Sequence, residues 1–206
     1  MTSLQPIKAL FLDIGGVLLT NGWDRNARRR AAELFNLDYE QLNERHHLTF
    51  DTYEAGKLSL DDYLKRIVFY EKRSYSPLEF TRFIMEQSQP YADMIQLISQ
   101  LKQTYGLKLI AVNNEGREIN SYRIRQFGLD TFIDAFVSSC YVHLRKPDVD
   151  IFQLALDVAQ VEPEQVIYID DRYMFVQIAR TVGMHCLHHT SIDSTQQALA
   201  SYGLTL

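Results

Sequence analysis

Three carboxylates in this chain follow directly on apolar runs, and two of them are adjacent. Asp13 ends the run from Lys8 to Leu12 and is followed, after one residue, by the glycine pair 15–16, while Asp170 and Asp171 end a second run that begins at Val166. Adjacent carboxylates repel each other unless a cation lies beside them. Three hard oxygen donors of this kind suit Mg²⁺, whose remaining coordination positions water would fill.

Two further polar motifs lie between these runs. Asn113 and Asn114 follow the apolar stretch 109–112, and Lys146 stands in a loop within Arg145-Lys146-Pro147. A carboxamide can donate to a phosphoryl oxygen, and a lysine supplies positive charge. The glycine pair after Asp13 is expected to take φ > 0 and to let an anionic group approach the main chain. The ordered set of acid, amide, lysine and paired acids therefore predicts chemistry on an anionic group.

Strand patterns alternate with helix patterns along the chain around these residues, which predicts an α/β fold. Expected strands are 8–12, 109–112, 135–138, 166–169 and 185–188, and expected helices are 94–105, 119–127, 149–159, 174–182 and 194–202. This alternation favours a Rossmann-like parallel sheet with helices on both faces. In such a sheet the ligand binds outside the carboxyl ends of the strands. Asp13, Asn113 and Asp170 all follow such ends.

The segment from 21 to 90 has no strand pattern and is expected to be all helical. Its expected helices are 26–35, 39–51, 59–70 and 77–88, with Ser59 and Asp62 in an N-terminal capping arrangement. Arg25 and the run 28–30 are interpreted as a solvated helix face, with attraction of an anionic substrate as the alternative. For Trp23 and Tyr53 a place in a substrate pocket stays open.

Composition limits the classes of function. The 206 residues are 46% hydrophobic and carry a formal net charge of −5, which argues against nucleic acid as a main partner. The apolar stretches are short, so no membrane span is expected. Only two cysteines are present and no signal-peptide pattern is seen at the N-terminus. These features predict a cytoplasmic location. They leave the oligomeric state open.

The order of these motifs resembles the haloacid dehalogenase (HAD) superfamily, specifically its phosphatase-like members with a helical cap inserted after the first strand. The resemblance rests on Asp13, Asn113, Lys146 and the acidic pair in Ile-Asp-Asp-Arg, which precedes a helix leading to Val-Gly-Met. It implies a HAD-like α/β core made of residues 1–20 and 91–206, with the cap at 21–90. Such a cap excludes water from the reacting group and selects the substrate.

The resemblance also implies roles for the motif residues. Asp13 would be the nucleophile of a phosphatase that acts through an aspartyl-phosphate on a small phosphorylated metabolite, such as a sugar phosphate. Lys146 and Asn113 would assist it. Mg²⁺ would be held by three groups and supported by a fourth, and four residues would bind the substrate. The metal set is Asp13, the carbonyl of Gly15, Asp170 and Asp171, and the substrate set is Gly16, Asn113, Asn114 and Lys146.

Three positions depart from the family pattern. Gly15 stands where most of the family's phosphatases carry a second Asp that protonates the leaving group, Asn113 replaces Ser or Thr, and Phe175 replaces Asn. A positioned general acid is worth about 10²–10⁴ in rate. Two alternatives therefore stay open, which are a phospho-ligand-binding or regulatory protein with weakened turnover, and a metal-independent haloacid dehalogenase. The acidic pair argues against the dehalogenase, because it has no use without a cation.

Overall fold

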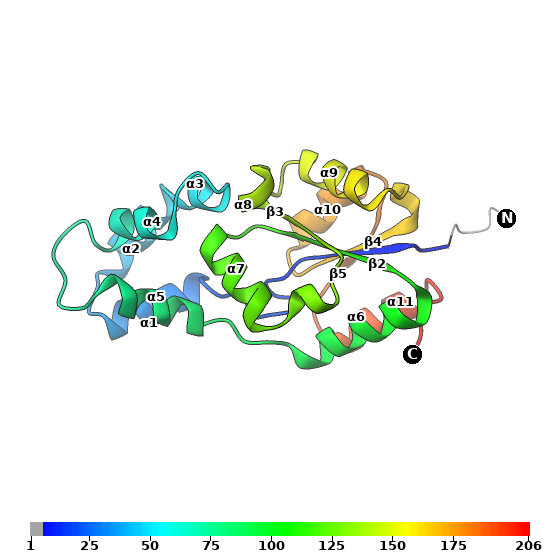
Figure 1. Ribbon diagram of the computed structural model, residues 1–206, viewed down its shortest axis with the longest axis horizontal. Coiled ribbons are helices and arrows are strands. Elements are labelled where there is room, and N and C mark those ends of the chain that lie inside the picture. Colours follow the sequence, from blue (N-terminus) through cyan, green and yellow to red (C-terminus); the bar gives the residue numbers. More distant parts are fainter. Residues whose placement is uncertain (1–5) are drawn as a thin grey trace.

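The computed structural model describes residues 6–206 and shows one sheet of five parallel strands in the order β3-β2-β1-β4-β5 (Figure 1). The strands are β1 (Ala9–Leu12), β2 (Lys108–Asn113), β3 (Ala135–Ser138), β4 (Val166–Asp170) and β5 (His185–His188). The predicted α/β class and parallel sheet are confirmed. The strand order turns back at β1, between β2 and β4, and such a switch point opens a crevice at the carboxyl ends of the strands.

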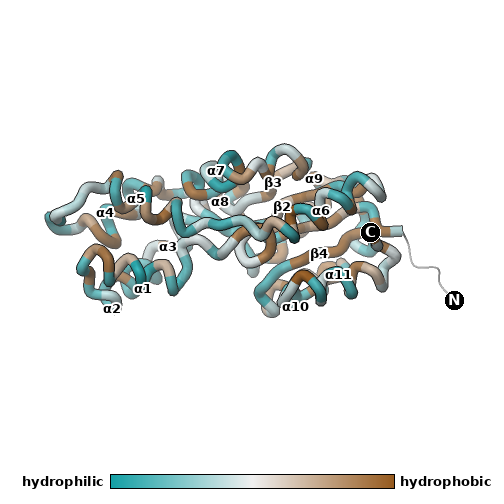
Figure 2. Tube along the Cα trace, turned by 90° about the horizontal axis from the view of Figure 1, so that it is seen from below, coloured by the Kyte–Doolittle hydropathy of each residue, from teal (hydrophilic) through white to brown (hydrophobic). Residues whose placement is uncertain are grey.

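Helices cover both faces of the sheet. α6 (Ala92–Tyr105) and α11 (Ile192–Ala200) pack on one face, and α9 (Asp150–Ala159) and α10 (Tyr173–Thr181) on the other. Successive strand residues point to opposite faces, so Leu10 and Leu12 join the first apolar cluster while Phe11 joins the second. Figure 2 shows the central strands as largely apolar segments and the helices as alternating polar and apolar stretches.

Shorter elements complete the α/β part of the chain. α7 (Arg117–Gln126) follows β2, α8 (Ser139–Val142) follows β3, and the 3₁₀ turns 129–131 and 163–165 precede β3 and β4. Within residues 6–206 no helix combines the length and the apolar character needed to cross a bilayer.

Five helices between β1 and α6 form a separate lobe with its own apolar cluster, at the left of Figure 1. They are α1 (Arg25–Leu34), α2 (Tyr39–His47), α3 (Phe50–Glu54), α4 (Leu60–Ile67) and α5 (Pro77–Glu86). Ser59 caps α4 as expected, since its Oγ accepts from the Asp62 amide at 3.0 Å. The single helix expected over 39–51 is wrong. α2 ends at the C-cap Leu48, and α3 begins at Phe50. The Thr49 hydroxyl donates to the Arg45 carbonyl and so satisfies an acceptor at the end of α2.

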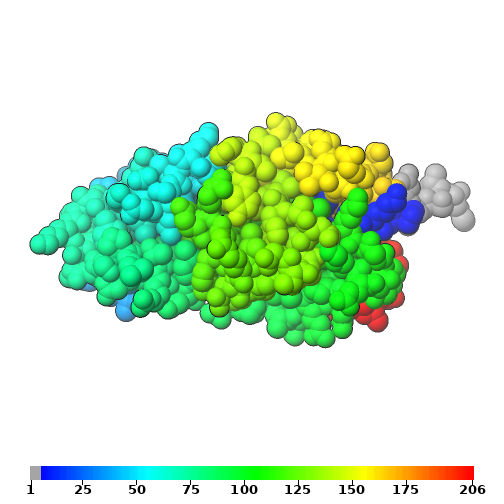
Figure 3. All heavy atoms as spheres, in the orientation of Figure 1, coloured from blue at the N-terminus to red at the C-terminus, as the bar shows by residue number. Residues whose placement is uncertain are grey.

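This helical lobe, called the cap below, is closed onto the sheet end by close backbone contacts. A Cβ on Gly56 would lie 2.2 Å from the Cys140 carbonyl oxygen, and one on Gly116 would lie 1.9 Å from Cζ of Tyr53. Arg145 pairs with Asp51 at 2.5 Å and also donates to Glu54. In Figure 3 the cap and the segment around residue 140 form a continuous surface. The sequence-based limits of 21 and 90 for the cap stay a prediction.

Candidate active site

The three carboxylates come together at the carboxyl ends of β1 and β4. These strands are neighbours with Leu12 opposite Ile169, and the Asp13 amide donates to the Ile169 carbonyl at 2.9 Å. One oxygen from each of Asp13, Asp170 and Asp171 lies within 4.8 Å of the others. More than 150 residues separate Asp13 from the adjacent pair Asp170 and Asp171, so it is the parallel pairing of β1 with β4 that assembles the cluster.

Lys146 supplies the charge that opposes this cluster. Its side chain is 1% exposed, and Nζ lies 3.2 Å from Oδ1 of Asp13 and 2.7 Å from Oδ2 of Asp170. Burial acts to lower the pKa of Lys146, but the two carboxylates outweigh it and raise that pKa, so the lysine stays charged. Tyr168 accepts from Lys146 Nζ at 3.1 Å, and the centre of the Phe175 ring lies 5.0 Å from the same nitrogen. Phe175 thus offers an aromatic face to the cation where the family usually has Asn.

The two oxygens of Asp13 differ in their surroundings. Oδ1 accepts from the Ile14 amide at 2.8 Å and faces Lys146 Nζ, whereas Oδ2 has no donor among residues 6–206. Burial raises the pKa of Asp13, Asp170 and Asp171 raise it further, and Lys146 opposes the rise. A cation beside the cluster would favour the ionised form. The arrangement leaves one carboxylate oxygen free to attack.

Asp171 carries the observation that fits a metal ion. Its Oδ1 is buried and has no hydrogen-bond partner in the described chain, although Oδ2 accepts from Asn21 Nδ2 at 3.2 Å. A buried carboxylate oxygen without a donor is costly unless a cation binds it. Gly16 leaves room for this carboxylate, because a Cβ there would lie 2.2 Å from Oδ2. The donor set suits a hard divalent cation.

The glycine pair differs from expectation at one position. Gly16 has φ of 75°, but Gly15 does not have a left-handed backbone. The expectation of φ > 0 at Gly15 is therefore wrong, since the tight turn after Asp13 needs that conformation only at the second glycine. A Cβ on Gly15 would lie 3.8 Å from Nη1 of Arg123, which pairs with Glu115 at 2.9 Å.

Asn113 and Asn114 have different roles in the structure. Asn113 is 2% exposed; its Oδ1 accepts from Ser138 and its Nδ2 donates to Asn120, and it does not line the cavity described below. Asn114 lines the cavity, and its carboxamide holds the main chain of Lys146 with two bonds of 2.8 and 2.9 Å. Asn114 thus positions the lysine. Direct contact between Asn113 and a substrate stays a prediction.

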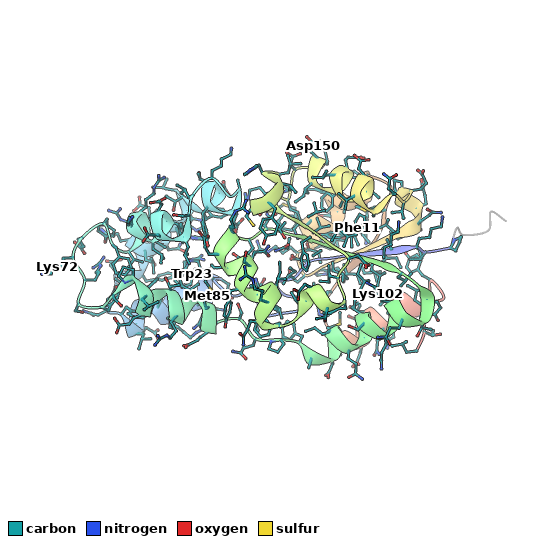
Figure 4. The ribbon with its side chains drawn as sticks, in the orientation of Figure 1. Phe11, Trp23, Lys72, Met85, Lys102 and Asp150 are labelled. Atoms are coloured by element: carbon teal, nitrogen blue, oxygen red, sulfur yellow. The ribbon has the colours of Figure 1, made fainter. Side chains whose placement is uncertain are left out.

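A cavity of about 300 Å³ lies between the carboxylate cluster and the cap. Asp13, Gly15 and Lys146 line it from the core, and Trp23 and Tyr53 line it from the cap. Both aromatic residues thus line the pocket, which is the position that the sequence left open for them. Figure 4 shows Trp23 in the part of the cap near the core, with Lys72 at the far tip.

Sequence reasoning missed several residues of the cavity wall. Glu115 and Arg123 form a buried pair there, and burial raises the pKa of Glu115 to about 7 against the opposing effect of Arg123. The position of Glu115 directly after the two asparagines was the available signal. Arg28, expected on a solvated face, is 6% exposed. It precedes the buried Ala31 and Ala32 by three and four residues, which places it on the apolar face of α1.

Comparison with known proteins agrees with this geometry. The family model of haloacid dehalogenase-like hydrolases matches residues 7–183. A phosphorylated carbohydrates phosphatase of Thermotoga maritima is 25% identical, covering 88% of this chain and 84% of its own, and a sesquiterpene phosphatase (astK) of Aspergillus oryzae is 26% identical, covering 91% and 92%. The HAD family enzyme BT-2542 of Bacteroides thetaiotaomicron, solved with magnesium and inorganic phosphate, has the same fold, with a TM-score of 0.74 at 17% identity over 88% of this chain and 93% of that one. With four family motifs gathered at one end of a parallel sheet under a helical cap, this chain belongs to the haloacid dehalogenase-like hydrolases.

Proposed function

We propose that this hydrolase is a Mg²⁺-dependent phosphatase of small phosphorylated metabolites, sugar phosphates among them. The observation that carries the proposal is the carboxylate cluster, whose member Asp13 lines the cavity, with Lys146 against one side of it and a free oxygen on Asp13. Curated relatives of similar length are phosphatases of phosphorylated carbohydrates and sesquiterpenes, which supports the class of reaction.

Asp13 acts as the nucleophile. Its Oδ2 attacks phosphorus in line, so that an O–P bond forms and the bond from phosphorus to the leaving oxygen breaks, which gives an aspartyl-phosphate. Water then attacks the same phosphorus, releases inorganic phosphate and restores the carboxylate. The hydrogen bond from the Ile14 amide and the contact with Lys146 hold Oδ1, and hence the orientation of the whole carboxyl group.

Charge stabilisation comes from Lys146, and a bound cation would add to it. Lys146 faces both Asp13 and the position of the phosphoryl oxygens, and Asn114 fixes its main chain. Mg²⁺ would be held by the carboxylates of Asp13, Asp170 and Asp171 and by the Gly15 carbonyl, and it would supply neutralisation of phosphoryl charge. The orphaned Oδ1 of Asp171 is the group that this binding would satisfy.

A phosphatase assay across a metabolite panel, with Mg²⁺ and with EDTA, tests the proposal. Turnover should need the metal, and Asp13→Asn should lose about a hundredfold or more of kcat. Asp130→Asn is the matched control, because it makes the same change at an exposed carboxylate away from the cavity. Dechlorination of 2-chloropropionate without metal would support a dehalogenase instead. Tight binding of phosphate esters without turnover would support the phospho-ligand-binding protein.

A further inference from the structure

The cap wall of the cavity contains a buried cation with no carboxylate partner. Arg28 is 6% exposed, lines the cavity, and forms no ion pair within 4.0 Å among residues 6–206. Its three hydrogen bonds go to neutral acceptors, which are the Trp23 carbonyl at 2.9 Å and Oδ1 of Asn43 at 3.3 and 3.2 Å. A guanidinium has five N–H donors. Two of them, one on each terminal nitrogen, are therefore left without a partner in the described chain.

The other buried or half-buried cations of the cavity wall each have a carboxylate partner, whereas Arg25 and Arg172, which also line the cavity, are exposed. Lys146 faces Asp13 and Asp170, Arg123 pairs with Glu115, and Arg145 pairs with Glu54 and Asp51. Asp24, the acid closest to Arg28 in sequence, uses Oδ1 to accept from the Ala27 amide at the start of α1. Burying a charge is costly unless an opposite charge compensates it. Arg28 is thus the buried cation of this wall that still lacks an anion.

A chain of hydrogen bonds places a second donor on the same wall. Trp23 Nε1 can only donate, and it donates to the Tyr63 hydroxyl at 2.9 Å. Tyr63 has a single hydroxyl proton, and because no other acceptor for it lies among residues 6–206, we assign it as donated to Nδ1 of His46, 2.7 Å away. Nδ1 is then an acceptor, so the ring proton of neutral His46 is on Nε2. This Nε2–H has no partner among residues 6–206, and the ring of Phe50 stacks on His46 at 5.0 Å.

We propose that the substrate carries, in addition to the phosphate that reacts at Asp13, a second anionic group that binds to Arg28 and to Nε2–H of His46. The second group is a carboxylate or a phosphate, since both present several acceptor oxygens to a guanidinium and a neighbouring N–H. This inference rests on the proposed function. It narrows the substrates to small phosphate esters that carry a second acidic group, with the two groups bound at opposite walls, one at the sheet end and one in the cap.

Matched pairs of esters test the proposal. For a carboxylate the pair is 3-phosphoglycerate and glycerol 1-phosphate, and for a second phosphate it is fructose 1,6-bisphosphate and fructose 1-phosphate. The kcat/KM ratio within each pair should favour the ester with the second anion by about tenfold to a hundredfold. The pair with the larger ratio identifies the second group.

Arg28→Met should bring this ratio to about one, and Arg28→Lys should keep part of it, because lysine retains the charge without the forked donors. Arg29→Met is the matched control, since it removes the same charge from an exposed neighbour on α1 outside the cavity wall. It should keep the wild-type ratio. A ratio near one in the wild type, or a ratio that survives Arg28→Met, overturns the proposal.

Binding to the turnover-deficient Asp13→Asn protein separates this inference from the proposed function. Calorimetric titration with each ester should show tighter binding of the ester with the second anion, and Arg28→Met in that background should abolish the difference. If neither ester is turned over but the ester with the second anion still binds more tightly, the phosphatase is refuted and the second-anion site is supported. Metal-dependent turnover without selectivity in either assay supports the phosphatase and refutes the second-anion site. If Arg28→Met does not fold, the ratio in Arg28→Lys decides, and an unchanged ratio refutes the role of the guanidinium fork.

Discussion

Gly16→Ala is expected to weaken cation binding in addition to lowering the stability of the fold. Gly16 has φ of 75°, and a Cβ there would lie 2.2 Å from Oδ2 of Asp171 and 2.3 Å from its Cγ. Ordinary contact begins near 3.4 Å, so the carboxylate must retreat by about 1 Å. Mg²⁺ requires near-ideal ligand distances of roughly 2.0–2.1 Å. Asp171 in the variant can therefore no longer share a cation with Asp13 and Asp170.

The magnitudes of the two effects can be separated. An alanine in the left-handed region costs about 1–2 kcal/mol, which lowers the Tm of a chain of this size by about 2–8 °C. Mg²⁺ at a hundred times its Kd adds about 2.7 kcal/mol to wild-type stability, or about 5–11 °C. If the variant binds ten times more weakly, the same Mg²⁺ concentration adds about 1.4 kcal/mol and roughly halves the rise.

Gly106→Ala is the matched control. Gly106 has φ of 66° at the end of α6, and a Cβ there would meet nothing within 4 Å. Gly106→Ala therefore has the same free-energy cost of a left-handed alanine, but its methyl group does not contact the carboxylate cluster. Thermal unfolding of the wild type and both variants, with EDTA and with Mg²⁺, gives the comparison. Equal Mg²⁺-dependent rises in Gly16→Ala and Gly106→Ala would refute the role given to Asp171, whatever their stability in EDTA.

Three further outcomes follow from the same contacts. Asp170→Ala and Asp171→Ala should both weaken Mg²⁺ binding in calorimetric titration, with the larger effect at Asp170 because it also binds Lys146; unchanged affinity in both would make the pair structural. Wild-type kcat/KM should depend steeply on leaving-group pKa. Gly15→Asp should flatten this dependence only in part, because Arg123 near that position would hold the new carboxylate ionised. Equal wild-type rates on aryl and alkyl phosphates would show that another group supplies the proton. Burial lowers the pKa of His46 from 6.5 to about 3, so its contribution to stability is present above pH 6.5 and is lost as the pH falls toward 3, about 3 kcal/mol of it by pH 4. His46→Gln should therefore show a shallower loss of stability in acid than the wild type, and parallel denaturation curves would contradict this.

The sheet and the carboxylate cluster at its edge are predictable from local sequence patterns. Short apolar runs ending in polar residues predict parallel strands, and the carboxyl ends of parallel strands meet at one edge. This reasoning from the sequence predicts that Asp13 lies beside Asp170. It worked because strand alternation and strand ends are local properties that a few consecutive residues reveal.

The walls of the cavity and the pairing of its charged side chains depend on contacts between segments that are distant in the sequence. The Arg123 guanidinium donates to the Thr20 carbonyl 103 residues away, and Tyr53 of the cap lies against Gly116 of the core. No local pattern encodes such contacts. The sequence predicted a solvated face for Arg28, whereas the packing of the cap buries it on the apolar face of α1, where no carboxylate of residues 6–206 pairs with it. Burial and pairing depend on which distant segments meet, and this is why the fold and the carboxylate cluster could be predicted from sequence while the specificity of the cavity could not.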